Sequence, residues 1–142
     1  LFAIYGDPGV MRFVGEPPFP ELATVSQMLA SVERLLAVGE SLEWGLVLRE
    51  SGHLIGTCGL HSFVADPVQA GLPQAEVGCM LARSHWGQGL MFEALSAVTG
   101  YAGELGIRTL LADIEPDNLP SQRLFRRLDF VWQQGTLYRL ER

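Results

Sequence analysis

The sequence is poor in cysteine, in charge and in long apolar runs, and each shortage excludes a class of protein. It has two cysteines, Cys58 and Cys79, in apolar strand-like segments without the spacing of metal ligands. We therefore expect two buried, reduced thiols rather than a disulfide or a zinc site. No apolar run approaches the roughly 20 residues of a membrane-spanning helix, and no basic segment marks a signal peptide at the start. These absences predict a cytoplasmic protein without a metal and without membrane contact.

The few charges that are present carry an acidic excess. Charged residues make up 18% of the 142 residues, and the formal net charge is −6. This balance disfavours binding to nucleic acid or to an anionic membrane, and it mildly favours cationic substrates such as amines. Hydrophobic residues make up 48%, which excludes a disordered chain. We predict a single domain over residues 1–142, which buries about two thirds of its unfolded surface.

The most informative stretch joins an apolar strand to a helix through two glycines. The strand covers residues 75–81, and Gly87 and Gly89 then open a helical run that ends at Gly106. Amides at a helix N-terminus lack intrahelical partners and carry partial positive charge, and glycine lets an anion approach them. The turn therefore suits a phosphate, although two glycines before a helix are also compatible with a simple tight turn. The sequence patterns of dinucleotide-binding folds and of P-loops are both missing here.

The remaining elements follow from hydrophobic periodicity and from turn residues. The pattern predicts a mixed α/β sheet with helices on both faces. Residues 61–73 carry two prolines and a glycine, and we expect them to form a long exposed loop. The predicted helices cover residues 24–38, 89–104 and 118–128, and the predicted strands cover residues 44–49, 53–60, 75–81, 109–114, 130–134 and 137–140.

Two motifs in this order resemble the GNAT superfamily of N-acetyltransferases. Trp86-Gly87-Gln88-Gly89-Leu90-Met91 is similar to the acetyl-CoA turn of that family, although Met91 replaces the usual small residue. Glu115-Pro116-Asp117-Asn118-Leu119-Pro120-Ser121 resembles the Asn-x-x-Ser motif of its RimJ/RimL-like branch, the ribosomal-protein N-terminal acetyltransferases. Residues 56–60 resemble the third strand of the family and residues 6–13 its opening helix. The usual first strand would precede Leu1 and is absent from this chain.

The resemblance implies a fold, an activity and a set of contacts. The fold would be a mostly antiparallel mixed sheet with a splayed central strand pair and helices on both faces. The activity would be direct transfer of an acetyl group from acetyl-CoA to a primary amine through a ternary complex, in a monomer or a homodimer. The amine would belong to a protein N-terminus or a small molecule. A non-catalytic CoA-binding sensor is the alternative. The residues implied to contact acetyl-CoA are Cys79, Met80, Leu81, Trp86, Gly87, Gln88, Gly89, Leu90, Met91, Asn118, Ser121 and Phe125.

Candidate catalytic groups each have a structural alternative. Glu76 stands among small and apolar neighbours. A carboxylate in such surroundings is costly unless it is hydrated, paired or functional. Glu76 is therefore either the catalytic base or part of a salt bridge. His61 is a second candidate base or an ordinary solvated histidine. The resemblance implies that Ser121 protonates the departing thiolate, because Phe125 stands where many relatives have tyrosine. Ser121 would otherwise only satisfy backbone groups at a helix start.

Two further features concern the substrate border and a helix end. The resemblance places Phe13 and Phe19 beside the acceptor, and ordinary core or lid packing is the alternative for both. Asp129 occupies a position where the family usually has glycine, at the end of the last helix. We therefore expect a left-handed backbone at Asp129.

Overall fold

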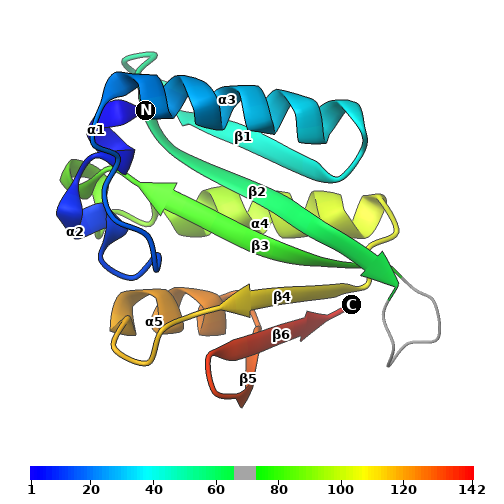
Figure 1. Ribbon diagram of the computed structural model, residues 1–142. Helices are drawn as coiled ribbons and strands as arrows, with labels where there is room; N and C mark the ends of the chain where they lie inside the picture. The colour runs from blue at the N-terminus through cyan, green and yellow to red at the C-terminus, as the bar shows by residue number, and fades with distance from the viewer. Residues whose placement is uncertain (66–72) are drawn as a thin grey trace.

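One mixed sheet organises the protein. The computed structural model describes residues 1–65 and 73–142, and within them six strands form a sheet in the order β1-β2-β3-β4-β6-β5 (Figure 1). All neighbouring strands are antiparallel except β3 and β4, which are parallel. The predicted mixed, mostly antiparallel sheet is thus confirmed. The strands are β1 Ser41–Val47, β2 Leu54–Ala65, β3 Pro73–Leu81, β4 Thr109–Asp113, β5 Val131–Gln134 and β6 Leu137–Glu141.

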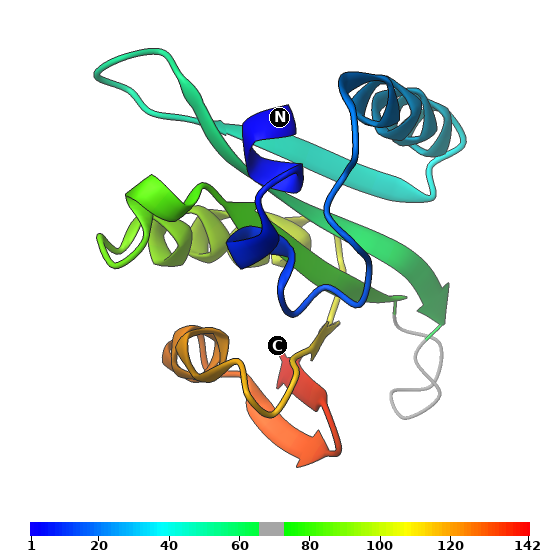
Figure 2. The ribbon, with the colours of Figure 1, turned by 60° about the vertical axis from the view of Figure 1, so that its left-hand side comes forward.

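Helices lie on both faces of this sheet, as predicted. The alternation of side chains along β2 shows the two faces, because Cys58 packs against α4 whereas the hydroxyl of Thr57 bonds to Tyr5 of α1. Helices α4 and α5 cover one face, and α1, α2 and α3 lie on the other side (Figure 2). The helices are α1 Phe2–Tyr5, α2 Pro8–Met11, α3 Leu22–Ala37, the 3₁₀ turn η1 Arg83–His85, α4 Leu90–Glu104 and α5 Leu119–Arg127.

The hydrophobic core lies between the sheet and the pair α4 and α5. Leu60 of β2, Leu95 of α4 and Leu110 of β4 have essentially no exposed surface. Met91, Leu95, Val98 and Ala102 follow the 3.6-residue period along the buried side of α4. None of the helices in the described part of the chain is long and apolar enough to span a bilayer.

The start of the chain and the end of β2 differ from the predictions. Residues 6–13 do not form one opening helix, because Asp7 caps a separate short helix that begins with Pro8. Strand β2 does not end at Leu60 but continues to Ala65 through a bulge, and Ser62 within that bulge has a φ of 54°. The predicted loop over residues 61–73 is therefore wrong for residues 61–65, of which His61, Val64 and Ala65 pair with β3, and for Pro73, which begins β3. Its middle, residues 66–72, lies outside the described residues.

The central pair β3 and β4 separates after a short parallel contact. Only three residue pairs join them in the described ladder, namely Gln74 with Thr109, Ala75 with Leu110 and Glu76 with Leu111. Beyond Glu76 the two strands diverge, as Figure 1 shows. The predicted splayed strand pair is confirmed. The backbone of β3 from Val77 onward keeps its ladder with β2 and faces the divergence with its other edge.

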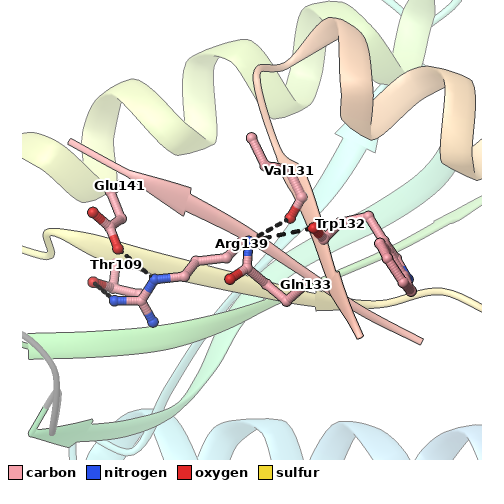
Figure 3. A network of polar contacts seen from close by, with 6 residues as sticks. All are labelled: Thr109, Val131, Trp132, Gln133, Arg139 and Glu141. Carbon is pink, nitrogen blue, oxygen red and sulfur yellow. Dashed lines mark hydrogen bonds and ion pairs between the residues drawn. The ribbon is translucent and has the colours of Figure 1, made fainter. Parts of the chain in front are cut away.

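Polar side-chain contacts lie along strands β4, β5 and β6 (Figure 3). Arg139 of β6 donates from Nε to Oε1 of Glu141 over 2.6 Å and from Nη2 to Oγ1 of Thr109 over 3.3 Å. Gln133 donates to the backbone oxygens of Val131 and Trp132. Side-chain contacts therefore supplement the backbone ladder between β4 and β6.

Helix α5 ends in a Schellman motif, as the position of Asp129 predicts. The amide of Phe130 donates to the Phe125 carbonyl over 3.0 Å, and the amide of Asp129 donates to the Arg126 carbonyl over 3.0 Å. The rings of Phe125 and Phe130 pack edge to face with centroids 5.0 Å apart, which supplies the hydrophobic contact of that motif. Asp129 has a φ of 70°, so the left-handed backbone is confirmed.

Replacing Asp129 by glycine is expected to stabilise the fold. A non-glycine residue in the left-handed region costs roughly 1 kcal/mol, and the exposed Asp129 makes no side-chain hydrogen bond within the described residues. A gain of about 1 kcal/mol would raise the melting temperature by about 2–4 °C in a domain of this size. Thermal unfolding of Asp129→Gly and Asp129→Ala checks this, because alanine keeps the strain and should give no such rise.

Candidate active site

The two-glycine turn forms an open helix N-terminus. Gly87 and Gly89 have φ values of 75° and 76°, and Gly89 is the N-cap of α4. The first helical hydrogen bond runs from the amide of Glu93 to the Gly89 carbonyl, so the amides before Glu93 have no intrahelical acceptor. A β-carbon added at either glycine would meet no other described atom within 4 Å. The turn therefore has the free amides, the positive dipole end and the open approach that an anion needs.

Trp86 attaches this turn to the end of the central strand. Its indole Nε1 donates to the carbonyl of Leu81 over 2.8 Å, while the ring stays 48% exposed. The carbonyl of Leu81 lies at the end of β3, where the parallel partner has already diverged. The tryptophan that opens the motif thus positions the loop on β3.

Arg83 ties the same turn to the first helices of the chain. Its guanidinium bonds to Oδ1 of Asp7, which also accepts from the amide of Gly9 over 2.8 Å. A β-carbon at Gly9 would overlap the guanidinium, so the pair depends on glycine there. The hydrogen bond from Arg83 holds the pKa of Asp7 below its usual value, so the carboxylate is ionised at neutral pH. Helix α2 and η1 are therefore linked by a charged contact that the sequence gave no reason to expect.

The side chains of Met91 and Phe125 belong to the core. Met91 is 7% exposed and packs in the cluster beneath α4, so only its amide faces the turn. This explains why a large residue is compatible with the second half of the motif. Phe125 is 4% exposed and packs against Phe130, so its ring serves the helix end and the core.

The start of α5 carries the second motif. Asn118 is the N-cap, and its Oδ1 accepts from the amide of Ser121 over 3.3 Å. Gln122 fastens the preceding loop through hydrogen bonds to the carbonyls of Glu115 and Pro116. Ser121 is half-buried, and within the described residues its hydroxyl has no hydrogen-bond partner. The local role of Asn118 as a cap is confirmed, and the Ser121 hydroxyl remains available.

Both cysteines carry free thiols on neighbouring strands. Cys58 of β2 and Cys79 of β3 are register partners, Cys58 being fully buried and Cys79 half-buried. Desolvation raises their pKa values to about 11 and about 12, so both thiols are protonated at neutral pH. Among the described residues, no group of three His, Cys, Asp or Glu side chains could hold a metal ion.

Glu76 and His61 face each other across β2 and β3. They are register partners, and Nδ1 of His61 lies 3.5 Å from Oε2 of Glu76. Both side chains keep close to half of their surface exposed, 43% for His61 and 48% for Glu76. The pairing that was the structural alternative for Glu76 is present, and the carboxylate still faces solvent beside the divergence of β3 and β4.

The predicted residues therefore fall into three groups around one end of the splayed pair. The glycine turn follows β3, Asn118 and Ser121 follow β4 at the start of α5, and Glu76 marks the point where the two strands part. Phe19 stacks on Tyr5 with ring centroids 5.1 Å apart, on the face opposite the core. Phe13 lies beneath the guanidinium of Arg12 at 4.8 Å, which accounts for it as local packing.

Comparison with known families agrees with this geometry. The model of the acetyltransferase (GNAT) domain matches residues 1–131. The chain belongs to the GNAT family of acetyltransferases. Its enzyme class is therefore that of the acetyl-CoA-dependent N-acetyltransferases, and the resemblance to this superfamily is confirmed.

Relatives of this GNAT domain include two longer bacterial proteins. The uncharacterized N-acetyltransferase p20 of Bacillus licheniformis is 28% identical over 92% of this chain and 71% of its own. The uncharacterized N-acetyltransferase YoaA of Bacillus subtilis is 26% identical over 97% of this chain and 81% of its own. Among solved structures, RimL, a ribosomal α-N-protein acetyltransferase in complex with coenzyme A, has a TM-score of 0.80 at 17% identity. That comparison covers 99% of this chain and 84% of RimL, and it shows a shared fold.

Proposed function

We propose that this GNAT domain transfers the acetyl group of acetyl-CoA directly to a primary amine, bound together with it in a ternary complex. The observation that carries the proposal is the left-handed pair Gly87 and Gly89, which leaves free amides at the start of α4. These amides lie next to the end of β3, where the strand loses its parallel neighbour. An anion site beside an open strand edge suits a long ligand with a pyrophosphate and an extended arm.

The residues present fit acetyl-CoA, which would supply the activated acetyl thioester. The amides from Gly87 to Met91 would bind its pyrophosphate, and Trp86 would hold that loop in place. The backbone of residues 79–81 would donate to the oxygen that becomes negative during transfer, as oxyanion donors do in acyl transfer. Asn118 would bond the pantetheine arm with its remaining amide hydrogens, which capping does not use.

We assign the removal of the amine proton to Glu76 and the protonation of the thiolate to Ser121. Glu76 stands where β3 and β4 part and faces solvent, so it would receive the amine proton, directly or through water. Ser121 would return a proton to the departing thiolate, because its hydroxyl is half-buried and has no partner among the described residues. Phe125 has no proton to offer and lies in the core.

The acceptor class follows from the chemistry of amines. A backbone α-amine has a pKa of about 7.7–8.0 and a lysine side chain about 10.4, so a weak carboxylate base is adequate for the first. The net charge of −6 favours cationic acceptors. RimL, which shares the fold, is described as an α-N-protein acetyltransferase. We therefore propose a protein N-terminal α-amine or a small-molecule amine as acceptor.

Initial-rate kinetics with varied acetyl-CoA and acceptor peptides test this proposal. A ternary complex predicts intersecting double-reciprocal lines, whereas parallel lines would indicate an acetyl-enzyme and contradict direct transfer. Acetyl-CoA binding without release of thiol on any α-amino peptide or polyamine would favour the sensor alternative. The chain contains no lysine, so transfer of label to acceptor is not confused with lysine self-acetylation.

A further inference from the structure

Three strands carry a row of residues that faces away from the core. Glu43 of β1 is the register partner of Gly59 on β2, and Gly59 is the register partner of Gly78 on β3. We call Glu43, Gly59 and Gly78 the glycine row. Thr57, which bonds to Tyr5 of α1, lies two residues from Gly59 on the same face. The glycine row therefore lies on the face of the sheet that packs against α1, opposite the face that α4 covers.

The carboxylate of Glu43 bends over the first glycine of the row. A β-carbon at Gly59 would overlap Oε2 of Glu43, so the carboxylate lies directly above the backbone of β2. Neighbouring strands are about 4.8 Å apart, so Gly78 lies one strand further on. A β-carbon at Gly78 would meet only Nε2 and Cδ2 of His61, at 3.4 and 3.9 Å. Gly78 thus leaves part of the β3 backbone accessible beside His61, between Glu43 and the place where β3 and β4 part.

The surroundings of Glu43 favour a proton acceptor rather than a structural ion. The side chain is open to solvent, yet the protein around it desolvates the carboxylate and raises its pKa to about 7. No ion pair or hydrogen bond to Glu43 exists within the described residues. Burial raises the pKa of Tyr5, and the charge of Glu43 adds to the rise, which places the phenol nearby. The titratable groups on the same face of the sheet as Glu43 are Tyr5 of α1, His61 of β2 and Glu76 of β3. The thiols of Cys58 and Cys79 lie on the opposite face but within electrostatic range of Glu43, and Glu33 and Arg34 of α3 are exposed.

We propose that Glu43 receives the proton of the acceptor ammonium, which approaches β3 over the half-buried backbone of Gly78. This inference rests on the proposed acetyl transfer. The step is R–NH₃⁺ plus the Glu43 carboxylate giving R–NH₂ plus the Glu43 carboxylic acid. The neutral amine then forms the new N–C bond as the C–S bond breaks. Its second proton passes to Glu76 and, through water, replaces the proton that Ser121 gives to the thiolate, while Glu43 returns its proton to solvent. Glu76, the partner of His61, keeps the role that the proposed function gives it and takes the proton that the amine loses as the new bond forms.

Glu43→Gln tests the proton transfer with a serine-initiated peptide and spermidine as acceptors. For the peptide, wild type should show a bell-shaped profile of kcat/KM, with limbs near pH 7 for Glu43 and near the amine pKa. The kcat/KM of the variant at pH 7 should be about 10²–10⁴-fold lower than that of wild type, and its acetyl-CoA affinity should be unchanged. Its kcat/KM should rise once with pH, as the pH passes the pKa of the amine. Glu50→Gln, in the exposed turn after β1, is the matched control and should keep the wild-type profile.

Gly78→Ala tests the approach of the amine along the row. An added β-carbon there makes only ordinary contacts, so the fold should be retained while the path to β3 narrows. We expect the acceptor KM to rise about tenfold or more, with acetyl-CoA affinity unchanged. Gly100→Ala, in open space on α4, is the control. An acceptor KM for Gly78→Ala equal to that of wild type would overturn the assigned path.

Two outcomes separate this inference from the proposed function. Wild-type turnover with an unchanged pH profile in Glu43→Gln would refute the role of Glu43 and leave acetyl transfer standing. If neither acceptor is acetylated, the role of Glu43 can be tested by carboxyl NMR of ¹³C-glutamate-labelled protein. Coenzyme A is present in this experiment, and methylammonium is added as a probe for the acceptor ammonium. Methylammonium should shift the Glu43 signal and lower its apparent pKa, and less so in Gly78→Ala. An unmoved signal would overturn the proposal.

Melting temperatures show whether Glu43→Gln loses activity only because it has lost its fold. The folded pKa of Glu43 lies above its ordinary value of 4.5, so protonation favours the folded protein. Its stabilising contribution is complete below pH 4.5 and is lost as the pH rises through about 7. Glu43→Gln cannot ionise, so its melting temperature should exceed that of wild type at pH 8 and match it near pH 4.

Discussion

Replacing Gly89 by valine should weaken acetyl-CoA binding by about 100-fold or more. Gly89 has a φ of 76°, which a β-branched residue adopts only under strain of roughly 1–2 kcal/mol. The new side chain would also occupy the open space through which an anion reaches the amides of α4. Each lost hydrogen bond to a charged group is worth about 1.5–3 kcal/mol, and 1.4 kcal/mol corresponds to a factor of ten. Isothermal titration calorimetry with acetyl-CoA measures the effect.

Gly39→Val is the matched control for backbone strain. Gly39 has a φ of 73° and also lies in open space, but it is in the turn between α3 and β1. Both variants should lose similar stability in thermal unfolding, whereas only Gly89→Val should lose acetyl-CoA affinity. Equal affinities for the two variants would show that the turn is not the pyrophosphate site.

Ser121→Ala should lower the turnover number by about 10²–10⁴-fold and leave acetyl-CoA affinity almost unchanged. The reason is that Ser121 offers an uncommitted hydroxyl at the start of α5, while its amide is capped by Asn118. Single-turnover measurements are required, because slow product release would otherwise mask the chemical step. A near-native single-turnover rate would identify water as the proton source.

Two control variants separate this loss from damage to the helix. Ser96→Ala removes a hydroxyl that bonds to the Phe92 carbonyl on α4, away from the α5 terminus, and should keep its rate. Asn118→Ala removes the cap and should cost about 1 kcal/mol of stability. If Ser121→Ala loses stability like Asn118→Ala and keeps its turnover number, the serine has only a local role.

Local signals were sufficient to predict most elements of this fold. The apolar period of α4, the strand that precedes Gly87 and the left-handed Asp129 each depend on a few adjacent residues. The extension of β2 to Ala65 was missed because it depends on pairing with residues 73–76, and the nearby prolines and glycine indicated a loop. A strand end that is fixed by a partner far along the chain leaves little trace in its own sequence.

The candidate site divides in the same way. Motif residues such as Gly89 and Asn118 were predicted because backbone geometry at a helix start demands those residue types. Glu43 was overlooked because its importance depends on its register partner Gly59 on β2, and on Gly78 of β3, which pairs with Gly59. Alternation along β1 puts Glu43 and Gly45 on one face, which was the only available signal. The pair of Asp7 and Arg83 joins residues 76 positions apart and carried no signal at all.

The divergence of β3 and β4 has a consequence for which molecules can pair with the backbone of β3. An unpaired strand edge on the outside of a sheet is a template for pairing with another chain. In this protein the unpaired edge of β3 lies inside the sheet, with β4 joined to its first half and α4 packed behind it. A chain that paired with this edge would have to enter between β3 and β4, which favours a narrow, extended ligand over a second sheet. The separation of β3 and β4 therefore leaves backbone hydrogen-bonding groups of β3 unpaired and also restricts which molecules can bond to them.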